Sequence, residues 1–270
     1  QRVLATYGYS KRKKLFRRSL AKRESTLESL VKGYEFWDKK RVVVTGHTGF
    51  KGGWLSLWLK YLGAEVHGFS MPPPTEPCFF DQANLRDLLE SKTGDIRDRE
   101  SVLEYFKRTQ PEIVFHLAAQ PIVKKSYEDP YETYSTNVMG TLNVLDAVRL
   151  TKSVKASIIV SSDKCYENKE WYWGYRENEA MGGYDPYSSS KGAMELLVSS
   201  FRRSFFSSHG PAISSVRAGN VIGGGDWAPD RLIPDAVRAF SAGDKLYVRN
   251  PNSTRPWQHV LEPLSGYVSL

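Results

Sequence analysis

Short apolar runs rich in β-branched residues alternate with helical periods from residue 41 onward. The runs predict strands, and they lie at 41–45, 65–69, 91–95, 113–118, 156–161 and 212–218. The helical periods predict helices, and these lie at 53–62, 82–90, 101–109, 131–150, 187–206, 234–242 and from 261 onward. Such alternation is typical of an α/β fold, a doubly wound parallel sheet with helices on both faces.

Charge is distributed unevenly along the chain. Residues 1–33 hold 10 Lys and Arg against 2 Asp and Glu, whereas the other residues hold 28 of each, so the net charge of +8 belongs to an N-terminal extension. We expect this extension to be solvated and flexible, although its charge would also suit an acidic partner or organelle import. The neutral remainder has no basic face, so a nucleic acid is not an expected partner.

Composition narrows the class of protein further. The 40% of hydrophobic residues excludes a disordered or collagen-like chain, and 270 residues can bury a sizeable core. Cys78 and Cys165 are too few for a disulfide scaffold, so we expect reduced thiols and a cytoplasmic protein. No apolar run approaches the roughly 18 residues that span a bilayer, and a membrane is therefore not an expected partner.

Three glycines lie between the first predicted strand and the helix that follows it. Gly46, Gly49 and Gly52 have the spacing G-x-x-G-x-x-G, and their bare backbone lets the amino end of a helix approach a pyrophosphate. Thr48 and Phe50 of the same loop complete the predicted cofactor contacts. The loop therefore predicts a Rossmann-like dinucleotide-binding site, although an ordinary glycine turn has the same appearance in a sequence.

The end of the second strand carries no acidic residue for a ribose. Gly68, Phe69 and Ser70 lie there, which leaves the choice between NAD and NADP open, with NAD expected. Asp95 and Ile96 follow the third strand, where a carboxylate would receive the adenine amino group. The alternative for Asp95 is a cap of the next helix.

Tyr187 and Lys191 are four residues apart in a predicted helix, so they share one face of it. The ammonium is expected to lower the pKa of the phenol, and a phenolate can take the proton of a substrate alcohol. Ser162, at the end of the fifth strand, would hydrogen-bond the substrate oxygen. Together the three residues predict a hydride-transfer site that works with a nicotinamide cofactor. Asp163 and Lys164 add two titratable groups that permit an elimination, although a solvated turn is the alternative.

Several long strings of the sequence resemble the extended short-chain dehydrogenase/reductases, and within them the CDP-glucose 4,6-dehydratases. The resemblance covers about residues 34 to 270, and its strings are 45–52, 116–121, 134–141, 162–166, 217–227 and 255–260. Asp163 followed by Lys164 resembles the CDP-glucose branch, because related dTDP- and GDP-sugar dehydratases carry Asp-Glu there. The resemblance implies a dinucleotide-binding domain over 34–219. It also implies a smaller substrate-binding portion that starts at 220 and is incomplete at its C-terminal end.

The reaction implied by the resemblance is the NAD-dependent dehydration of CDP-D-glucose to CDP-4-keto-6-deoxy-D-glucose. It proceeds by oxidation at C4, loss of water across C5 and C6, and return of the hydride to C6. The resemblance makes Asp163 the acid for the C6 hydroxyl and Lys164 the base at C5. A lysine base must fall from a pKa of about 10.4, while a neighbouring carboxylate raises that pKa, so an orienting role for Lys164 stays open.

Positions around these motifs supply the remaining candidates. The residues expected to line the cofactor groove after the fourth strand are Ala118, Ala119 and Gln120. Asn137 is expected to brace the fourth and fifth strands by hydrogen bonds, with a plain helix residue as the alternative. Asn220, Arg231 and Arg255 are candidates for the substrate diphosphate, because guanidinium forks match phosphate oxygens. Surface ion pairs are the alternative for both arginines.

The expected partners are the small-molecule substrate and further copies of the chain, as a dimer or tetramer, and no metal site is expected. Two other functions stay open at this point. One is another nucleotide-sugar 4,6-dehydratase or a 4-epimerase. The other is a non-catalytic dinucleotide-binding regulator whose basic tail contacts a partner.

Overall fold

The computed structural model describes residues 35–206 and 210–270, so the basic extension lies outside the described residues. Six parallel strands form the central sheet in the order β3-β2-β1-β4-β5-β6. The strands are β1 (Arg41–Thr45), β2 (Glu65–Ser70), β3 (Glu90–Thr93), β4 (Ile113–His116), β5 (Ala156–Val160) and β6 (Ala212–Val216). The predicted doubly wound α/β fold is confirmed.

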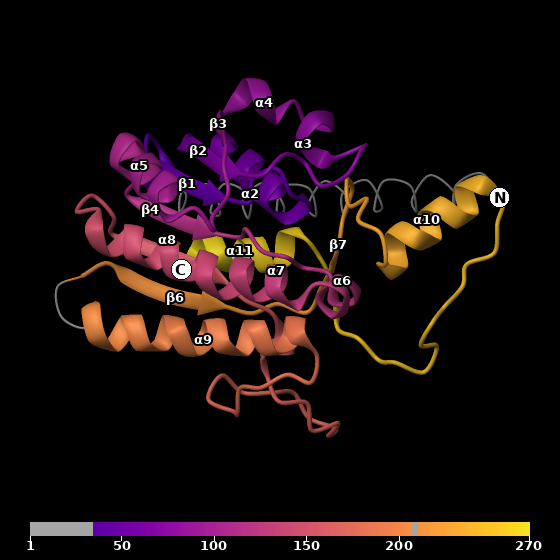
Figure 1. The fold of residues 1–270 in the computed structure, drawn as a ribbon. Coiled ribbons are helices and arrows are strands. Elements are labelled where there is room, and N and C mark those ends of the chain that lie inside the picture. Colours follow the sequence, from indigo (N-terminus) through magenta and orange to yellow (C-terminus); the bar gives the residue numbers. More distant parts are fainter. Residues whose placement is uncertain (1–34, 207–209) are drawn as a thin grey trace, which may run out of the picture.

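Alternate residues of the buried strands point to opposite faces of the sheet. Val42 and Val44 of β1 pack in one apolar cluster, and Val43 packs in the other. The helices of the first cluster are α2 (Phe50–Tyr61), α3 (Phe79–Gln82), α4 (Leu85–Leu88) and α11 (Leu261–Ser269). The helices of the second cluster are α5 (Arg99–Thr109), α8 (Gly140–Leu150) and α9 (Pro186–Phe205). Helices cover both faces of the sheet (Figure 1), which explains why the sequences of its buried strands are apolar without alternation.

A long helical segment connects β4 to β5. It begins with α6 (Val123–Glu128) and α7 (Pro130–Tyr134), and it passes through the π-helical turn η2 (Ser135–Met139) into α8. The predicted helix at 131–150 is thus confirmed in extent, whereas its change of pitch at η2 has no sequence signal.

Two predictions of secondary structure are wrong in detail. The predicted helix at 82–90 is instead the pair α3 and α4, because Asn84 between them has a left-handed backbone with φ of 52°. The predicted helix at 53–62 begins three residues earlier, at Phe50, so the second half of the glycine loop is already helical.

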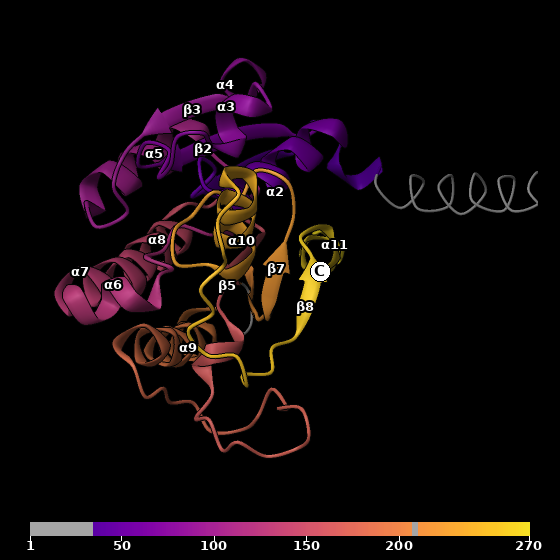
Figure 2. The ribbon, with the colours of Figure 1, turned by 90° about the vertical axis from the view of Figure 1, so that its right-hand side faces the viewer.

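The last part of the chain forms a smaller unit beside the sheet. It contains β7 (Asn220–Ile222), α10 (Leu232–Ala242) and β8 (Trp257–His259), and β7 pairs with β8 in parallel. Figure 2 shows the two strands side by side next to α11, with α10 beyond them. No pattern in the sequence predicted this two-stranded sheet.

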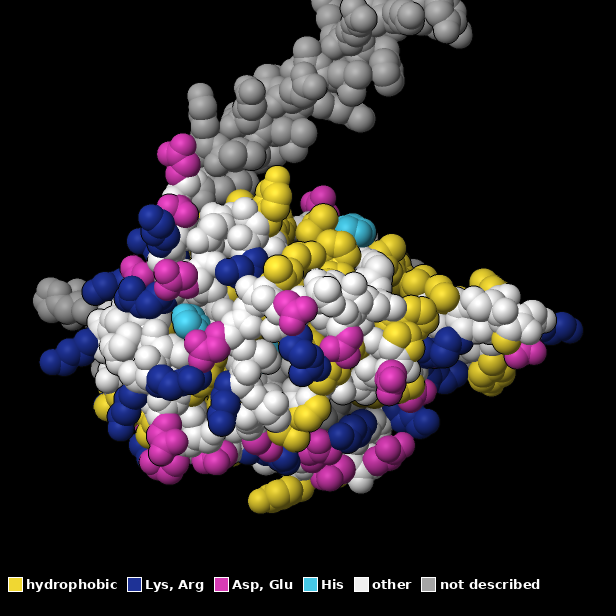
Figure 3. Space-filling model, turned by 90° about the horizontal axis from the view of Figure 1, so that it is seen from above, with side chains coloured by type: hydrophobic (Ala, Val, Ile, Leu, Met, Phe, Trp, Pro, Cys, Tyr) yellow, Lys and Arg dark blue, Asp and Glu magenta, His cyan; other side chains and the backbone are white. Residues whose placement is uncertain are grey.

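The short 3-10 helices η1 (Glu35–Trp37) and η3 (Asp163–Cys165) complete the described elements. Within the part of the chain that the structure describes, no helix combines the length and the apolar character needed to cross a bilayer. Seen from above, acidic and basic side chains are interspersed over the surface of the body (Figure 3). On this face, therefore, the charges form no patch of a single sign.

Two histidines are buried beside the sheet in the neutral form. His116 is 2% exposed, and its Nδ1 and Nε2 lie 2.7 Å from the Thr45 hydroxyl and 3.0 Å from the Thr141 hydroxyl. Because Thr141 donates its own hydrogen to the Asn137 carbonyl, His116 carries its proton on Nε2. Burial lowers the pKa of His116 to about 3 and that of the fully buried His47 to about 4.

These two pKa values predict a loss of stability in mild acid. Both are lower in the folded chain than the ordinary 6.5, so stability is present above pH 6.5 and falls as the pH drops toward 4 for His47 and 3 for His116. Each histidine contributes about 1.4 kcal/mol per pH unit in that window. Urea unfolding should therefore give a free energy about 3 kcal/mol lower at pH 5.5 than at pH 7.5. His116→Gln should remove about half of this difference, and an unchanged pH dependence would contradict the prediction.

Candidate active site

The predicted site residues meet at the carboxyl ends of the strands, where the sheet changes its winding direction between β1 and β4. The glycine loop follows β1, residues 117–120 follow β4, and residues 162–166 follow β5. This edge is the usual ligand site of an open parallel sheet.

The glycine loop brings three backbone segments into close contact. Gly46 has a φ of +77°, and a Cβ there would lie 2.6 Å from the Ala118 nitrogen. A Cβ on Gly52 would lie 2.1 Å from the Gly46 carbonyl oxygen, which no side chain can do. Gly49 precedes α2 and provides no side-chain cap, so the first N–H groups of the helix are left for a ligand. The loop thus has the form that a pyrophosphate requires.

Thr48 and Phe50 of the loop make contacts within the protein. The Thr48 hydroxyl lies 2.8 Å from the Ser70 hydroxyl and donates to the Met71 carbonyl at 2.9 Å. A Cβ on Gly223 would lie 3.2 Å from the Phe50 ring, so Phe50 packs toward the smaller unit. Thr48 therefore ties the loop to the end of β2, where the sequence has no carboxylate.

Asp95 does not cap the helix that follows it. Asp98 accepts the capping bond from the Ser101 N–H, so that alternative for Asp95 is wrong. Asp95 instead accepts three hydrogen bonds from Arg97, at 2.6 to 2.8 Å. Burial raises the pKa of Asp95, but these bonds outweigh burial and hold the pKa below its ordinary value. Ile96 is buried against α8, and its predicted contact with a cofactor stays a prediction, as does that of Asp95.

Asn137 lies in the π-helical turn η2 and joins two chain segments. Its side chain accepts from the Gln120 N–H at 2.8 Å and donates to the Gln120 carbonyl at 3.1 Å. It also donates to the Ser190 hydroxyl, which in turn bonds the Tyr187 carbonyl. The expectation that Asn137 braces β4 and β5 therefore needs correction, because the bonds connect the segment after β4 with α9. Ala118 and Ala119 precede Gln120 and are half-buried at the same edge.

The predicted catalytic pair lies on the buried face of α9. Asp185 caps this helix through the Ser188 N–H, and Tyr187 and Lys191 are 8% and 4% exposed. The Lys191 ammonium donates to the Val160 carbonyl at 3.3 Å. Burial, with help from the charge of Lys51, lowers the pKa of Lys191 to about 8.

The phenol of Tyr187 differs from the expectation. Burial raises its pKa, and the Ser162 hydroxyl and the Arg231 charge only partly oppose that rise. Lys191 is not among the groups that lower the pKa of Tyr187, and its ammonium donates to the Val160 carbonyl. Tyr187 therefore carries its proton in this structure.

Ser162, Asp163 and Lys164 form one turn after β5. The Ser162 hydroxyl accepts from the Lys164 N–H at 3.2 Å and donates to the Asp163 carboxylate at 3.0 Å. The Asp163 N–H donates to the Ala218 carbonyl, which fixes the turn against the chain after β6. Ser162 is buried, whereas the other two are half-buried and open to a ligand. The structure thus brings the predicted acid, base and serine together.

Lys51 lies close to the predicted site, although no sequence pattern assigned it a role. It lies in the first turn of α2, and its Nζ is 5.8 Å from the centre of the Tyr267 ring. Burial and the charge of Arg231 lower the pKa of Lys51 to about 8, while Asp163 opposes them. Its position in the glycine loop could have indicated this, because a lysine in that loop must lie at the carboxyl ends of the strands.

The three predicted diphosphate ligands are not equivalent. Arg231 bonds the buried carboxylate of Asp226 at 3.0 Å, and its charge acts on both Lys51 and Tyr187. Arg255 is exposed and donates to the Thr254 carbonyl, and Asn220 pairs in the β7–β8 sheet. Of the three, Arg231 is the one whose charge acts on the predicted catalytic Tyr187.

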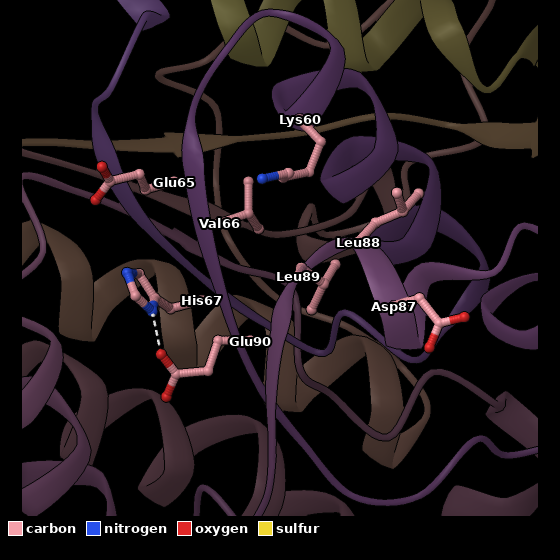
Figure 4. Close-up of a pocket in the computed structure, with 8 residues that line it drawn as sticks. All are labelled: Lys60, Glu65, Val66, His67, Asp87, Leu88, Leu89 and Glu90. Atoms are coloured by element: carbon pink, nitrogen blue, oxygen red, sulfur yellow. Dashed lines mark hydrogen bonds and ion pairs between the residues drawn. The ribbon is translucent and has the colours of Figure 1, made fainter.

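A surface hollow and groups of possible metal ligands are two other features that could form a site. A shallow hollow of about 350 Å³ lies at the opposite, amino-terminal end of β2 and β3 (Figure 4). Its lining includes the hydrogen bond between His67 and Glu90, and none of the predicted site residues is part of it. Within the described ranges, no three His, Cys, Asp or Glu side chains gather in a group that could hold a metal ion.

Comparison with known proteins now identifies the family. The profile of the GDP-mannose 4,6 dehydratase family matches residues 43–269. The chain belongs to this family. A curated relative, CDP-glucose 4,6-dehydratase of Salmonella typhimurium, is 60% identical over 86% of this chain, and the chain spans 66% of that relative's length.

Solved structures agree with the fold of this family. An epimerase of Methanothermobacter thermautotrophicus matches with a TM-score of 0.75 and 25% identity, over 87% of this chain and 68% of its own. A dTDP-glucose 4,6-dehydratase of Streptomyces venezuelae, solved with NAD bound, matches with a TM-score of 0.73 and 23% identity, over 84% and 70%. At that identity the second likeness concerns the fold alone.

The contact between Gly52 and Gly46 predicts the effect of one added methyl group. Gly52→Ala must displace the loop backbone, so we expect a loss of about 1–3 kcal/mol in stability and at least tenfold weaker NAD binding. Gly266→Ala is the matched control, because nothing lies within 4 Å of its Cβ in α11. Calorimetric titration with NAD and thermal unfolding measure both effects. Unaltered NAD binding by Gly52→Ala would contradict the assignment of the loop.

Proposed function

We propose that this chain catalyses the NAD-dependent dehydration of CDP-D-glucose to CDP-4-keto-6-deoxy-D-glucose. One observation carries the proposal: Ser162 and Asp163 act on the phenol of Tyr187, and Lys164 lies in the same turn after β5. An oxidation of the sugar alone requires the serine, the tyrosine and a lysine. The additional carboxyl and amine supply what an elimination of water needs.

The choice of CDP-glucose as substrate comes from the 60% identity to the Salmonella enzyme of that name. Lys164 after Asp163 agrees with this choice, because it matches the sequence pattern of the CDP-glucose branch. A 4-epimerase has no use for the acid and the base. The regulator hypothesis is disfavoured by a complete set of catalytic side chains in one place.

The protein's own residues fit NAD. The amino end of α2 has no side-chain cap, and the cradle between Gly46 and Gly52 would be filled by any Cβ. Gly46, Gly49 and Gly52 would hold the pyrophosphate, and Lys191 would hold ribose hydroxyls. When bound, NAD would take a hydride from C4 of the sugar and return it at C6.

The protein side chains would carry the proton transfers. Tyr187 must first lose the proton that it carries in this structure, and the phenolate then accepts the proton of the C4 hydroxyl, whose oxygen Ser162 holds by a hydrogen bond. Lys164 then takes the C5 proton, which the neighbouring ketone has made acidic. As the C5–C6 double bond forms, the C6–O bond breaks and Asp163 protonates the leaving hydroxyl, so that water departs. Lys164 would then return its proton to C5 as the hydride is restored to C6. Arg231 is the ligand for the substrate diphosphate that the structure favours.

A homo-oligomer, either dimer or tetramer, and a location in the cytoplasm form part of the proposal. Large apolar side chains on one side of the body support self-association, since Tyr131 is 83% and Leu196 63% exposed. Cys78 and Cys165 are both free and buried, in agreement with a reducing compartment. Light scattering of the purified protein measures the oligomeric state.

The decisive experiment is mass spectrometry of nucleotide sugars after incubation with the protein and NAD. CDP-glucose should lose one water without net reduction of NAD, whereas dTDP-glucose, UDP-glucose and GDP-mannose should react far more slowly. Loss of water from one of the others but not from CDP-glucose would replace the proposed substrate. No reaction with any of the four would overturn the function.

Removal of the Lys164 amine should separate the two halves of the reaction. Lys164→Ala should keep hydride transfer but slow the loss of water by at least about 100-fold, because no general base remains at C5. Exchange of the C5 hydrogen in deuterated water measures the missing step directly. Lys169→Ala is the control, since this exposed lysine pairs with Glu167 outside the site. Dehydration at the normal rate would assign Lys164 an orienting role instead.

Removal of the Tyr187 hydroxyl should stop the reaction at its first step. Tyr187→Phe keeps the buried ring in place but leaves no group to take the C4 proton. Rapid mixing with CDP-glucose and NAD should then show no transient absorbance of reduced nicotinamide. A transient of normal amplitude would show that another group accepts the proton.

A further inference from the structure

A third ionisable side chain shares the buried face of α9 with the catalytic pair. Glu195 follows Lys191 by four residues, as Lys191 follows Tyr187, so the three lie one turn apart. Glu195 is 5% exposed. At this spacing a carboxylate and an ammonium ordinarily attract each other, and burial strengthens the attraction.

Arg217 engages the Glu195 carboxylate instead. Its Nε and one terminal nitrogen donate to the two carboxylate oxygens at 2.8 Å and 2.9 Å, and the Ser215 hydroxyl donates at 2.7 Å. Both oxygens are thus occupied from the chain at the end of β6. The Lys191 ammonium accordingly faces the Val160 carbonyl at the end of β5.

The other side of the Arg217 guanidinium reaches the catalytic turn. Its remaining terminal nitrogen donates to the Tyr166 hydroxyl at 2.7 Å and to the Glu177 carbonyl at 3.1 Å. The guanidinium carbon also lies 4.9 Å from the centre of the Tyr166 ring. Tyr166 is separated from Lys164 by Cys165 alone, so Arg217 fixes the chain that carries the proposed acid and base.

We propose that Arg217 is a positioning residue for the reaction. It keeps the Glu195 carboxylate away from Lys191, and through Tyr166 it holds the Asp163–Lys164 turn against α9. This proposal rests on the proposed function. Arg217 would be the side chain that keeps Lys191 and the Asp163–Lys164 turn correctly placed relative to each other.

Electrostatics add support to this geometry. The charged and titratable groups that face Lys191 are Lys51 from α2, Glu195 from α9 itself, Cys165 from η3 and His116 from β4. Among them Glu195 and Cys165 raise the pKa of Lys191, whereas burial and Lys51 lower it to about 8. If Arg217 is removed, Glu195 becomes a buried carboxylate whose neighbouring cation is Lys191. The ammonium is then drawn along the helix, away from Tyr187.

The test compares Arg217→Gln, Glu195→Gln and the double variant with the unaltered protein. Arg217→Gln should lower kcat for CDP-glucose by about 100-fold, since misplacement by about 1 Å has that effect. The double variant, which has no unpaired carboxylate, should recover to within about tenfold of the unaltered protein. A double variant as impaired as Arg217→Gln would overturn the proposal. Arg217→Gln with at least half of the original kcat would overturn it too.

The pH dependence gives a readout that a merely structural role would not move. The alkaline loss of activity, assigned to deprotonation of Lys191, should shift to higher pH in Arg217→Gln and to lower pH in Glu195→Gln. Shifts in the same direction, or none, would overturn the proposal. The pH dependence of NAD affinity, measured without any sugar, should also shift to higher pH in Arg217→Gln and to lower pH in Glu195→Gln. Failure of the proposed substrate therefore remains distinguishable from failure of this proposal.

Two more variants separate positioning from folding. Arg149→Gln removes an arginine from an ion pair on the surface of α8, with Asp146, and should retain full activity and stability. Tyr166→Phe keeps the ring but loses the bond to Arg217, so it should slow dehydration more than it slows oxidation. If Arg217→Gln does not fold, the double variant and Tyr166→Phe decide the matter. An equal effect of Tyr166→Phe on both steps would overturn the link to the Asp163–Lys164 turn.

Discussion

A buried ammonium beside a buried carboxylate is the constraint on which the catalytic face of this protein depends. Lys191 and Glu195 lie one turn apart inside the fold, where charge is costly unless every group is matched. The match is made by different strands: the end of β5 offers a carbonyl to the lysine, and the end of β6 offers a guanidinium to the glutamate. The parallel order of these two strands is what places both partners under a single helix.

This arrangement also explains why the Tyr187 phenol, the Lys191 ammonium and the Ser162 hydroxyl stay together. Asn137 connects Gln120 after β4 with Ser190 on α9, and Ser190 bonds back to Tyr187. His116 is joined to the same region through Thr141 and to the strand before the glycine loop through Thr45. The ends of β1 and β4 and the helix α9 are thus connected by side chains of fixed hydrogen-bonding direction. The proposed reaction, which oxidises one sugar carbon and reduces another two bonds away, requires such fixed distances.

The sequence predicted much of this architecture because its signals are local. Strands buried on both faces read as continuous apolar runs, and parallel strands bring the residues after β1, β4 and β5 to one edge. The spacing of Tyr187 and Lys191 was likewise enough to place both on one helix face. What escaped prediction depends on contacts between distant residues. Arg217 lies 22 residues from Glu195 and 51 from Tyr166, and β7 and β8 are three residues each, too short for a periodic pattern.

The π-helical turn η2 restricts how the length of this segment can change during evolution. Its wider turn accommodates one more residue than a turn of α-helix would, and Asn137 lies within it. Deletion of a single residue there would restore the ordinary pitch and rotate the helix on one side by roughly 100° relative to the other. The amide of Asn137 would then face away from Gln120, although every other side chain of the helix was kept. We therefore expect natural variation here to exchange side chains while the residue count of the turn stays constant.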